Sequence, residues 1–334
     1  MREFAYERST SAQDAVERLA ADPDAQFLGG GTNLVDLMKL GVARPGRLVD
    51  VTGLPATIEQ NEDGALRIGA AVRNSDLAVD ARIRRDHPAL SEALLAGASG
   101  QLRNMATVGG NLLQRTRCLY FTDVSKPCNK REPGSGCPAR EGIHRDLGIL
   151  GTSEACVATH PSDMAVALAA LDATVVVQGR SAQRRLPLSA FYRLPGDDPT
   201  RDTTLEHGDL ITAVELPAPT ELSRSSTYRK ARDRASYAFA VGSVAAALVV
   251  ADGVVTQVRL AFGAVAPMPW RARVAEQAIL GGPATEHAFA AAMDLELSAA
   301  QPLPDNAFKV DLTRSLGVST LARLAGIDEQ GAQQ

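Results

Sequence analysis

Cysteine is missing from most of the chain, being absent before residue 118 and after residue 156. All four cysteines lie between these positions: Cys118, Cys128, Cys137 and Cys156. Cysteines that serve only as small core residues would be scattered along the chain. Four gathered thiolates can instead close a complete shell around a metal or an iron–sulfur cluster. The grouping therefore predicts a ligand site, with disulfides as the alternative.

The chain also lacks an apolar run of membrane length, and its N-terminus, MREFAYERSTSAQDAVERLA, has no hydrophobic signal core. Its net charge is −4, so the chain lacks the excess of basic residues that is typical of nucleic-acid-binding proteins. We therefore expect no membrane or nucleic-acid partner. We expect no export signal in the chain itself, and a location that is cytoplasmic, or periplasmic by co-export with a partner bearing a twin-arginine signal. Outside an oxidising compartment, clustered cysteines favour ligands over disulfides.

Several catalytic and metal-binding motifs are absent as well. There is no G-x-S-x-G element, and the five histidines form no H-x-H or H-x-x-x-H pair, which argues against a mononuclear histidine site. The cysteine spacing, C-x9-C-x8-C-x18-C, contains neither a zinc-ribbon C-x2-C nor a tight ferredoxin run. This spacing does not exclude an iron–sulfur cluster whose ligands come from one long loop. Lys126, Lys130 and Arg131 lie among the cysteines and would offset an anionic cluster, unless they only solvate the loop.

The first of two glycine-rich segments runs from Phe27 to Leu34 and reads FLGGGTNL. It lies between a predicted strand at 26–28 and a predicted helix at 34–40 that ends at Gly41. Glycines in this position let backbone N–H groups approach a phosphate. The segment is neither the G-x-G-x-x-G fingerprint nor a P-loop. A tight turn without a ligand is the alternative.

The second segment, 103–111, reads RNMATVGGN and offers small residues, a hydroxyl and backbone donors. Alone it could be a bulged strand. Together the two segments suggest one extended ligand with two phosphates, clamped from two sides. Farther on, Asp163 stands at the start of a predicted helix at 164–171, where it could cap the helix (as could Ser162) or contact the ligand.

The rest of the chain reads as a mixed α+β protein of two or three domains, because 334 residues with 45% hydrophobic content can bury sizeable cores. We predict an irregular segment at 114–155, a linker at 217–226, Ser75 as a helix N-cap and a frayed tail, EQGAQQ. The predicted strands are 47–51, 66–70, 174–178, 210–216 and 254–263, and an apolar segment covers 238–250. The predicted helices are 11–21, 87–98, 272–280, 287–300 and 313–325.

Taken together, the segments resemble the flavin-binding subunits of the molybdenum hydroxylase (xanthine dehydrogenase) family. The segments that carry the resemblance follow the family order: FLGGGTNLVDLMK, LRNMATVGGNLL, HPSDMAVALAALDA, DLITAVELP and YRKARDRASYAFA. The stretch CLYFTDVSKPCNKREPGSGC through SEAC is an insertion relative to xanthine dehydrogenases. It is similar to the insertion that holds an extra [4Fe–4S] cluster in the flavin subunit of bacterial periplasmic aldehyde oxidoreductases.

The resemblance implies an α+β fold in two parts. An FAD-binding domain of the PCMH type (vanillyl-alcohol-oxidase-like) would cover 1–217, with subdomains at about 1–55 and 56–217 and a cluster loop at 114–158. A C-terminal α+β domain like that of the carbon monoxide dehydrogenase flavoprotein would cover 226–328. The chain departs from some relatives at Leu95, Ala96 and Gly97, where those relatives place an aromatic residue against the flavin.

The resemblance also implies site residues by position. Cys118, Cys128, Cys137 and Cys156 would ligate a [4Fe–4S] cluster. Asp163 would bond the ribityl or ribose region, Ile211 would pack near the rings and Lys230 would lie beside the isoalloxazine. The full set of implied FAD contacts is Phe27, Leu28, Gly29, Gly30, Gly31, Thr32, Asn33, Leu34, Thr107, Gly110, Asn111, Asp163, Ile211 and Lys230.

The function implied by the resemblance is electron transfer within an aldehyde oxidoreductase. No residue of this chain would oxidise the substrate, because a molybdenum-cofactor subunit would do so. A [2Fe–2S] subunit would pass the electrons to FAD here, for delivery to a small-molecule acceptor, in a heterotrimer or higher multimer. The alternatives are a free-standing FAD oxidoreductase, a flavin subunit of a hydroxybenzoyl-CoA reductase or xanthine dehydrogenase complex, and a non-enzymatic assembly module with structural zinc.

Overall fold

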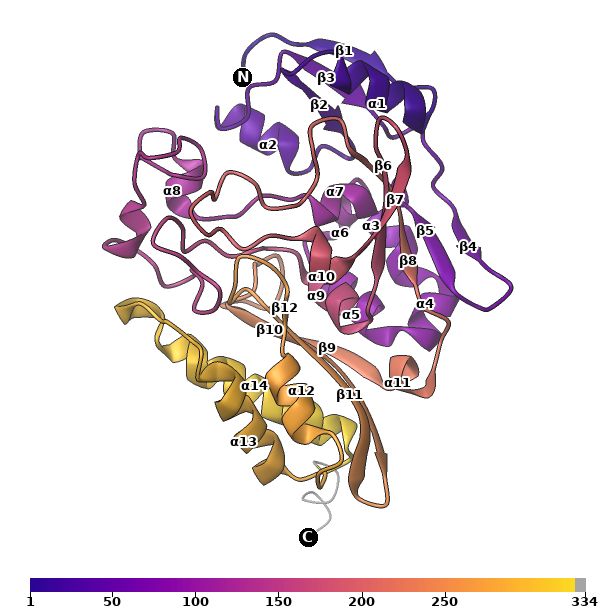
Figure 1. Cartoon of the computed structure of the whole chain (residues 1–334), viewed down its shortest axis with the longest axis vertical. Helices are drawn as coiled ribbons and strands as arrows, with labels where there is room; N and C mark the ends of the chain where they lie inside the picture. Colours follow the sequence, from indigo (N-terminus) through magenta and orange to yellow (C-terminus); the bar gives the residue numbers. More distant parts are fainter. Residues whose placement is uncertain (328–334) are drawn as a thin grey trace.

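The computed structural model describes residues 1–327, and the tail expected to fray lies outside the described residues. Three sheets follow one another through the molecule, from the N-terminal sheet through a central sheet to the C-terminal sheet and its helices (Figure 1). A long irregular segment, the cysteine loop (residues 114–158), projects from one side (Figure 1). No described helix is both long and apolar enough to cross a membrane.

The N-terminal sheet is parallel and has the order β1-β3-β2. Helix α1 begins because Ser11 accepts a hydrogen bond from the Asp14 N–H, and it packs its apolar face on the sheet. The predicted β-α-β unit is confirmed as β2-α2-β3, and Gly41 ends α2 with a φ of +74°. The elements are β1 (Ala5–Arg8), α1 (Ala12–Ala20), β2 (Ala25–Leu28), α2 (Leu34–Lys39) and β3 (Arg47–Asp50).

The central sheet is antiparallel and has the order β4-β5-β8-β6-β7. Its middle strands β6 and β8 coincide with the predicted strands and are almost wholly buried, as their β-branched and apolar sequences require. The strands are β4 (Ile58–Gln60), β5 (Leu66–Gly69), β6 (Thr174–Gln178), β7 (Gln183–Pro187) and β8 (Leu210–Leu216).

The helices of this region pack around α5 and α9, whose apolar residues belong to the largest core cluster. Helix α9 has Ser162 as its cap, because the serine hydroxyl accepts from the Ala165 N–H at 3.0 Å. The predicted cap at Ser75 is wrong: α3 begins at Asn74 and its cap position is Arg73, two residues before Ser75. The helices are α3 (Asn74–Val79), α4 (Ala81–Asp86), α5 (Pro88–Ala96), α6 (Gly100–Arg103), α7 (Val108–Leu112), α9 (Asp163–Ala170) and α10 (Leu188–Phe191).

The C-terminal sheet is antiparallel, in the order β12-β11-β10-β9, and lies between two layers of helices. Helices α5 and α9 contact one side, and α12 and α14 contact the other (Figure 1). The elements are α11 (Glu221–Arg224), β9 (Ser226–Ala231), β10 (Gly242–Ala251), β11 (Val254–Gly263), β12 (Trp270–Arg271), α12 (Arg273–Ile279), α13 (Glu286–Leu297), η2 (Pro304–Asn306) and α14 (Phe308–Leu324).

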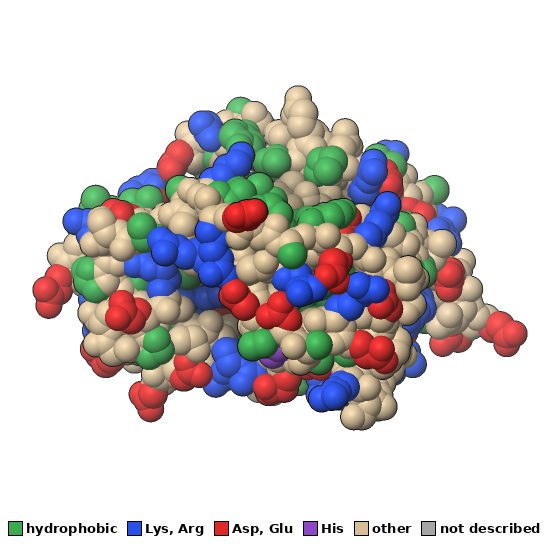
Figure 2. Space-filling view, turned by 90° about the horizontal axis from the view of Figure 1, so that it is seen from above, with side chains coloured by type: hydrophobic (Ala, Val, Ile, Leu, Met, Phe, Trp, Pro, Cys, Tyr) green, Lys and Arg blue, Asp and Glu red, His purple; other side chains and the backbone are tan. Residues whose placement is uncertain are grey.

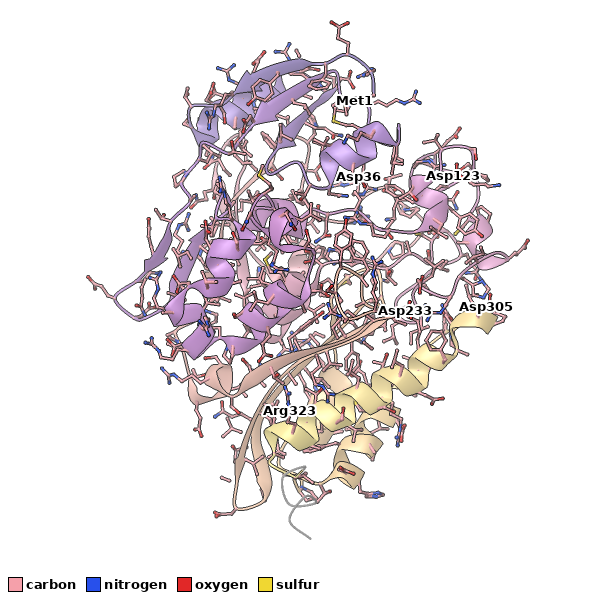
Figure 3. All side chains as sticks on the ribbon, turned by 180° about the vertical axis from the view of Figure 1, so that it is seen from behind. Met1, Asp36, Asp123, Asp233, Asp305 and Arg323 are labelled. Atoms are coloured by element: carbon pink, nitrogen blue, oxygen red, sulfur yellow. The ribbon has the colours of Figure 1, made fainter. Side chains whose placement is uncertain are left out.

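The cysteine loop is irregular, as predicted, apart from α8 (Leu119–Thr122) and η1 (Pro138–Arg140). Its end is anchored to the C-terminal part of the chain. The Lys309 ammonium donates to the carbonyls of Leu147 and Ala264, and the Asp305 N–H donates to His144 Nε2 at 3.0 Å. Figure 3 shows Asp305, just before α14, on this side of the molecule. These contacts tie the cysteine loop to the C-terminal part of the chain.

Candidate flavin cleft and cysteine cavity

A cleft of about 1610 Å³ opens where the three sheets meet, and both glycine-rich segments line it. Of the predicted FAD contacts, Leu28 does not line this cleft, and its carbonyl accepts from the Val51 N–H beside the N-terminal sheet. The predicted contacts that do line the cleft are Phe27, Gly29, Gly30, Gly31, Thr32, Asn33, Leu34, Thr107, Gly110, Asn111, Asp163, Ile211 and Lys230.

The first glycine segment forms a turn with unused hydrogen-bond donors. No described residue accepts from the backbone N–H groups of Gly30, Gly31 or Thr32. Asn33 Oδ1 accepts from the Arg115 N–H at 2.8 Å, while its buried Nδ2 has no partner among the described residues. Converging N–H groups and an unpaired amide donor suit an anion such as a pyrophosphate.

The second segment lies directly against the first. A Cβ on Gly30 would lie 1.8 Å from the Met105 carbonyl oxygen, so glycine is required there by chain contact, whatever the ligand. The expectation that this segment offers backbone donors is wrong from Val108 to Asn111. Those N–H groups already bond the carbonyls of Val72, Ala70 and Thr107 and the Thr107 hydroxyl, so the segment brings side chains to the cleft.

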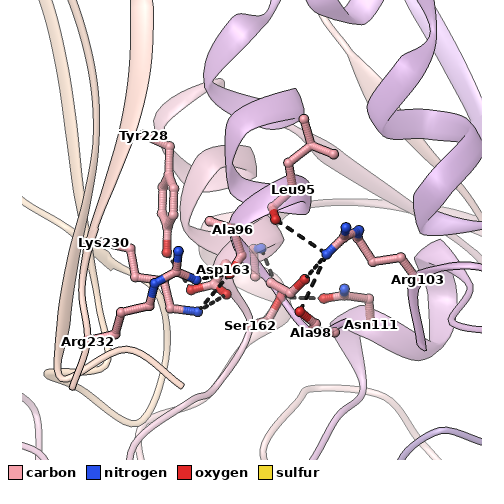
Figure 4. A network of polar contacts seen from close by, with 12 residues as sticks. Leu95, Ala96, Ala98, Arg103, Asn111, Ser162, Asp163, Tyr228, Lys230 and Arg232 are labelled. Atoms are coloured by element: carbon pink, nitrogen blue, oxygen red, sulfur yellow. Dashed lines mark hydrogen bonds and ion pairs between the residues drawn. The ribbon is translucent and has the colours of Figure 1, made fainter. Parts of the chain in front are cut away.

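A polar network closes the end of the cleft nearest β9 (Figure 4). Lys230 Nζ lies 2.8 Å from Asp163 Oδ2, with the two side chains 3% and 10% exposed. The Tyr228 hydroxyl donates to the other oxygen of Asp163, and burial, then this carboxylate, raises the pKa of the phenol well above its usual value. The adjacent Ser162 hydroxyl donates to Asn111 Oδ1 at 2.5 Å. The network thus joins α9, the second glycine segment and β9.

The segment after α5 takes part in the same network through its backbone. The Ala96 carbonyl accepts from Lys230 Nζ at 3.2 Å and from Arg232 at 3.1 Å. The Gly97 carbonyl accepts from Arg103 at 2.7 Å. Ile211 of β8 is 3% exposed and adds an apolar side chain to the lining of the cleft. One end of the cleft is therefore polar and charged, with an apolar wall suited to aromatic rings.

The four cysteines line one small cavity of their own, and all four are free. Nearby backbone N–H groups act to lower the pKa of three of the thiols: those of Tyr120 and Phe121 at Cys118, those of Ala139 and Val157 at Cys137, and that of Ala158 at Cys156. Such donors stabilise charge on thiolate sulfurs and tune clusters that the sulfurs ligate. The sequence-predicted cysteine set is thus brought together around one space.

Burial governs the chemistry of these thiols. It raises the pKa of Cys118 to about 11, and it raises the pKa of Cys137 and of Cys156, in the latter case against the charge of Lys130. Buried thiols therefore keep their protons unless a metal takes their place. Sulfurs that share one zinc lie about 3.8 Å apart, given a Zn–S bond near 2.3 Å. No three metal-ligating side chains within residues 1–327 approach closely enough to hold a single ion.

The three cations that lie between Cys118 and Cys137 differ in their surroundings. Lys126 is exposed, and Arg131 donates to the carbonyls of Tyr120, Phe121 and Lys126, holding the loop together. Lys130 is buried, and its Nζ lies 2.5 Å from Asp202 Oδ1.

Sequence analysis missed Asp202 and its second partner, Arg115, whose Nε lies 2.7 Å from Asp202 Oδ2. Burial opposes ionisation of Asp202, but Arg115 and Lys130 outweigh it and lower the pKa of this carboxyl. No motif marks either residue.

Over the face seen in Figure 2, acidic and basic side chains are interspersed, in keeping with the net charge of −4.

The family described as "FAD binding domain in molybdopterin dehydrogenase" matches residues 2–219, and "CO dehydrogenase flavoprotein C-terminal domain" matches residues 226–325. These two matches cover nearly the whole chain.

Two relatives agree with these matches. The chain is 50% identical over 326 residues to the aldehyde oxidoreductase FAD-binding subunit PaoB of Escherichia coli (strain K12), covering 96% of this chain and 98% of the relative. It is 26% identical to the carbon monoxide dehydrogenase medium chain of Hydrogenophaga pseudoflava, covering 90% and 88%.

Solved structures share the fold. A carbon monoxide dehydrogenase from Hydrogenophaga pseudoflava superposes with a TM-score of 0.75 at 24% identity, over 98% of each chain. Quinoline 2-oxidoreductase from Pseudomonas putida 86 gives 0.74 at 22% identity, again over 98% of each. The predicted α+β fold and the resemblance are confirmed: the chain belongs to the FAD-binding subunits of the molybdenum hydroxylase family.

Proposed function

We propose that this chain is the FAD- and [4Fe–4S]-binding electron-transfer subunit of a molybdenum-containing aldehyde oxidoreductase. The observation that carries the proposal is the cleft itself, where the unused N–H groups of Gly30, Gly31 and Thr32 face the space closed by Asp163 and Lys230. The 50% identity to an aldehyde oxidoreductase FAD-binding subunit supports the substrate class of the whole complex.

Each end of the cleft has a distinct task in this account. The Gly29–Asn33 turn holds the pyrophosphate by its N–H groups and by the Asn33 amide. Asp163, fixed by Lys230 and Tyr228, binds the ribityl or ribose hydroxyls, and Ile211 covers the ring system. FAD bound there supplies the ability to collect single electrons and to release them in pairs. The residues of the chain bind, orient and shield it.

The cysteine cavity holds the second cofactor in this account. The four cysteines contain no C-x2-C knuckle, and no described set of ligands is close enough to hold one ion. They are therefore better suited to a [4Fe–4S] cluster, in which each cysteine ligates a different iron, than to a single zinc. The backbone N–H groups beside Cys118, Cys137 and Cys156 would help to hold these sulfurs as thiolates once iron displaces their protons. These observations disfavour the zinc assembly module.

The partners would supply the remaining steps. A molybdenum-cofactor subunit would oxidise the aldehyde, and a [2Fe–2S] subunit would deliver the electrons to this chain, within a heterotrimer or higher multimer. A small-molecule acceptor would take them away. We propose that the FAD-binding domain covers residues 1–217 and the C-terminal domain 226–328, with the cysteine loop at 114–158.

The experiment that tests this function follows the flavin absorbance anaerobically after an aromatic or aliphatic aldehyde is added. The co-purified complex should bleach, whereas the isolated chain with FAD bound should not. Bleaching of the isolated chain would favour a free-standing oxidoreductase. An intact complex that holds FAD and molybdenum cofactor, but does not bleach with any of a panel of aldehydes, would contradict the substrate class.

A further inference from the structure

Lys130 differs in its surroundings from Lys126 and Arg131, the other two cations between Cys118 and Cys137. The Lys130 side chain is 5% exposed, and the residue lines both the cysteine cavity and the large cleft. Lys126 is exposed, so solvent screens its charge. The Arg131 guanidinium donates its hydrogen bonds to carbonyl groups of its own loop. Lys130 is therefore the buried one of these three cations, and it is also the basic residue among the described residues that line the cysteine cavity.

Lys130 is held in place by a segment distant in the sequence. Its Nζ lies 2.5 Å from Asp202 Oδ1 and donates to the Pro199 carbonyl at 2.8 Å. Asp202 is shared, because its other oxygen lies 2.7 Å from Nε of Arg115. Two cations thus meet one carboxylate, which leaves one positive charge uncompensated within the group.

The group also reaches the Gly29–Asn33 turn, which is called the flavin turn below. Arg115 donates through its side chain to the Thr200 carbonyl at 3.2 Å and through its backbone N–H to Asn33 Oδ1 at 2.8 Å. The Asp202 carboxylate therefore orients Lys130, which lines the cysteine cavity, and also Arg115. The backbone N–H of Arg115 in turn fixes the side-chain amide of Asn33 in the flavin turn. Lys130, Asp202 and Arg115 together are called the Asp202 triad below.

A positive charge in a poorly solvated setting favours the more negative redox state of a nearby group. An iron–sulfur cluster gains one negative charge when it takes up an electron. We propose that Lys130, clamped by Asp202, is the positioning residue that raises the reduction potential of the cysteine-held cluster, and that the uncompensated charge of the Asp202 triad is the cause. This inference rests on the proposed [4Fe–4S] cluster.

The test is an EPR-monitored redox titration of the whole complex, purified anaerobically, with iron and FAD measured on each sample. Lys130→Met removes the charge, Lys130→Arg keeps it, and Lys126→Met is the matched control from the same loop. At the wild-type midpoint potential, Lys130→Met should lower the ratio of reduced to oxidised cluster about tenfold, which for one electron is about 59 mV more negative. Lys130→Arg and Lys126→Met should stay near the wild type.

A variant of opposite sign keeps the inference testable if Lys130→Met does not assemble. Asp202→Asn removes the shared negative charge and should move the midpoint to more positive values. Midpoints of Lys130→Met and Lys126→Met that coincide, with iron content intact, would overturn the inference, as would an unchanged or more negative midpoint in Asp202→Asn. A wild-type complex without iron in this chain would instead refute the proposed cluster itself, and iron analysis separates the two outcomes.

Discussion

The ammonium of Lys230 lies 2.8 Å from the carboxylate of Asp163 and joins β9 to the start of α9. Both side chains are nearly buried, and the Tyr228 hydroxyl shares the carboxylate. This pair stands at the end of the cleft where the flavin-binding part meets the C-terminal sheet. Its loss should therefore affect stability as well as flavin binding.

Replacing Lys230 by Met should lower the free energy of unfolding by about 3–5 kcal/mol, because the Asp163 charge is left buried without its partner. The measurement is urea unfolding of the FAD-free chain, with the exposed Lys39→Met as control. The double variant with Asp163→Asn should recover part of the loss. Equal unfolding midpoints for Lys230→Met and Lys39→Met would show that the pair contributes nothing.

Gly30→Ala should destabilise the chain by about 1–3 kcal/mol and weaken FAD binding, because its Cβ has no room beside the Met105 carbonyl. Gly100→Ala is the matched control, since nothing lies within 4 Å of a Cβ there. Thermal unfolding and FAD titration measure the two effects. The close contact between the glycine segments would be wrong if both alanine variants behaved alike.

Asn33→Asp changes charge at almost constant shape and keeps the oxygen that accepts from the Arg115 N–H. The new negative charge should repel a pyrophosphate and weaken FAD binding at least tenfold, or about 1.4 kcal/mol. Fluorescence titration of FAD, against the exposed Asn104→Asp, gives the measurement. Undiminished affinity in Asn33→Asp would place the phosphates elsewhere in the cleft.

Cys128→Ser should lose most of the iron and keep much of the FAD, because the cysteine cavity and the flavin turn are built from different residues. Ser135→Ala is the control, since it removes only the hydroxyl that accepts from the Cys128 N–H at 2.9 Å. Iron analysis and flavin release are measured on the same samples. Unchanged iron in Cys128→Ser would remove this residue from the ligand set.

Acid should weaken the fold through His87, whose pKa falls to about 4 because the ring is buried; neither ring nitrogen has a partner among the described residues. The folded pKa lies below the unfolded value of 6.5, so the unfolded chain binds the proton first. Stability is complete above pH 6.5 and should fall by about 3 kcal/mol toward pH 4. Urea unfolding across this range should show a smaller slope for His87→Gln, and an equal slope would contradict the assignment.

Local patterns were sufficient for much of the fold. The β-branched run of β6 and the apolar run of β8 match their predicted bounds, because central strands are buried on both faces. The cap at Ser162, one of two candidates, and the end of α2 at Gly41 were also predictable, since each depends on its own neighbours. These signals lie within a few residues of the feature that they mark.

The remainder depends on distant contacts. β9 begins at the end of the predicted linker, and its pairing with β10 makes it a strand. α14 begins five residues before the predicted helix, at Phe308, where it packs against β10. Asp202 meets Lys130 across 72 positions, with no motif at either residue. The donors of the second glycine segment are used by the Ala70 and Val72 carbonyls, which no spacing within that segment reveals.

The central claim is that one chain binds a flavin in the cleft and an iron–sulfur cluster in the cysteine cavity. The most direct measurement is the FAD and iron content of this chain in the complex, isolated anaerobically from cells that also make the partner subunits. We expect one FAD and four irons bound to this chain. A colourless chain, with neither flavin nor iron after such a preparation, would contradict it.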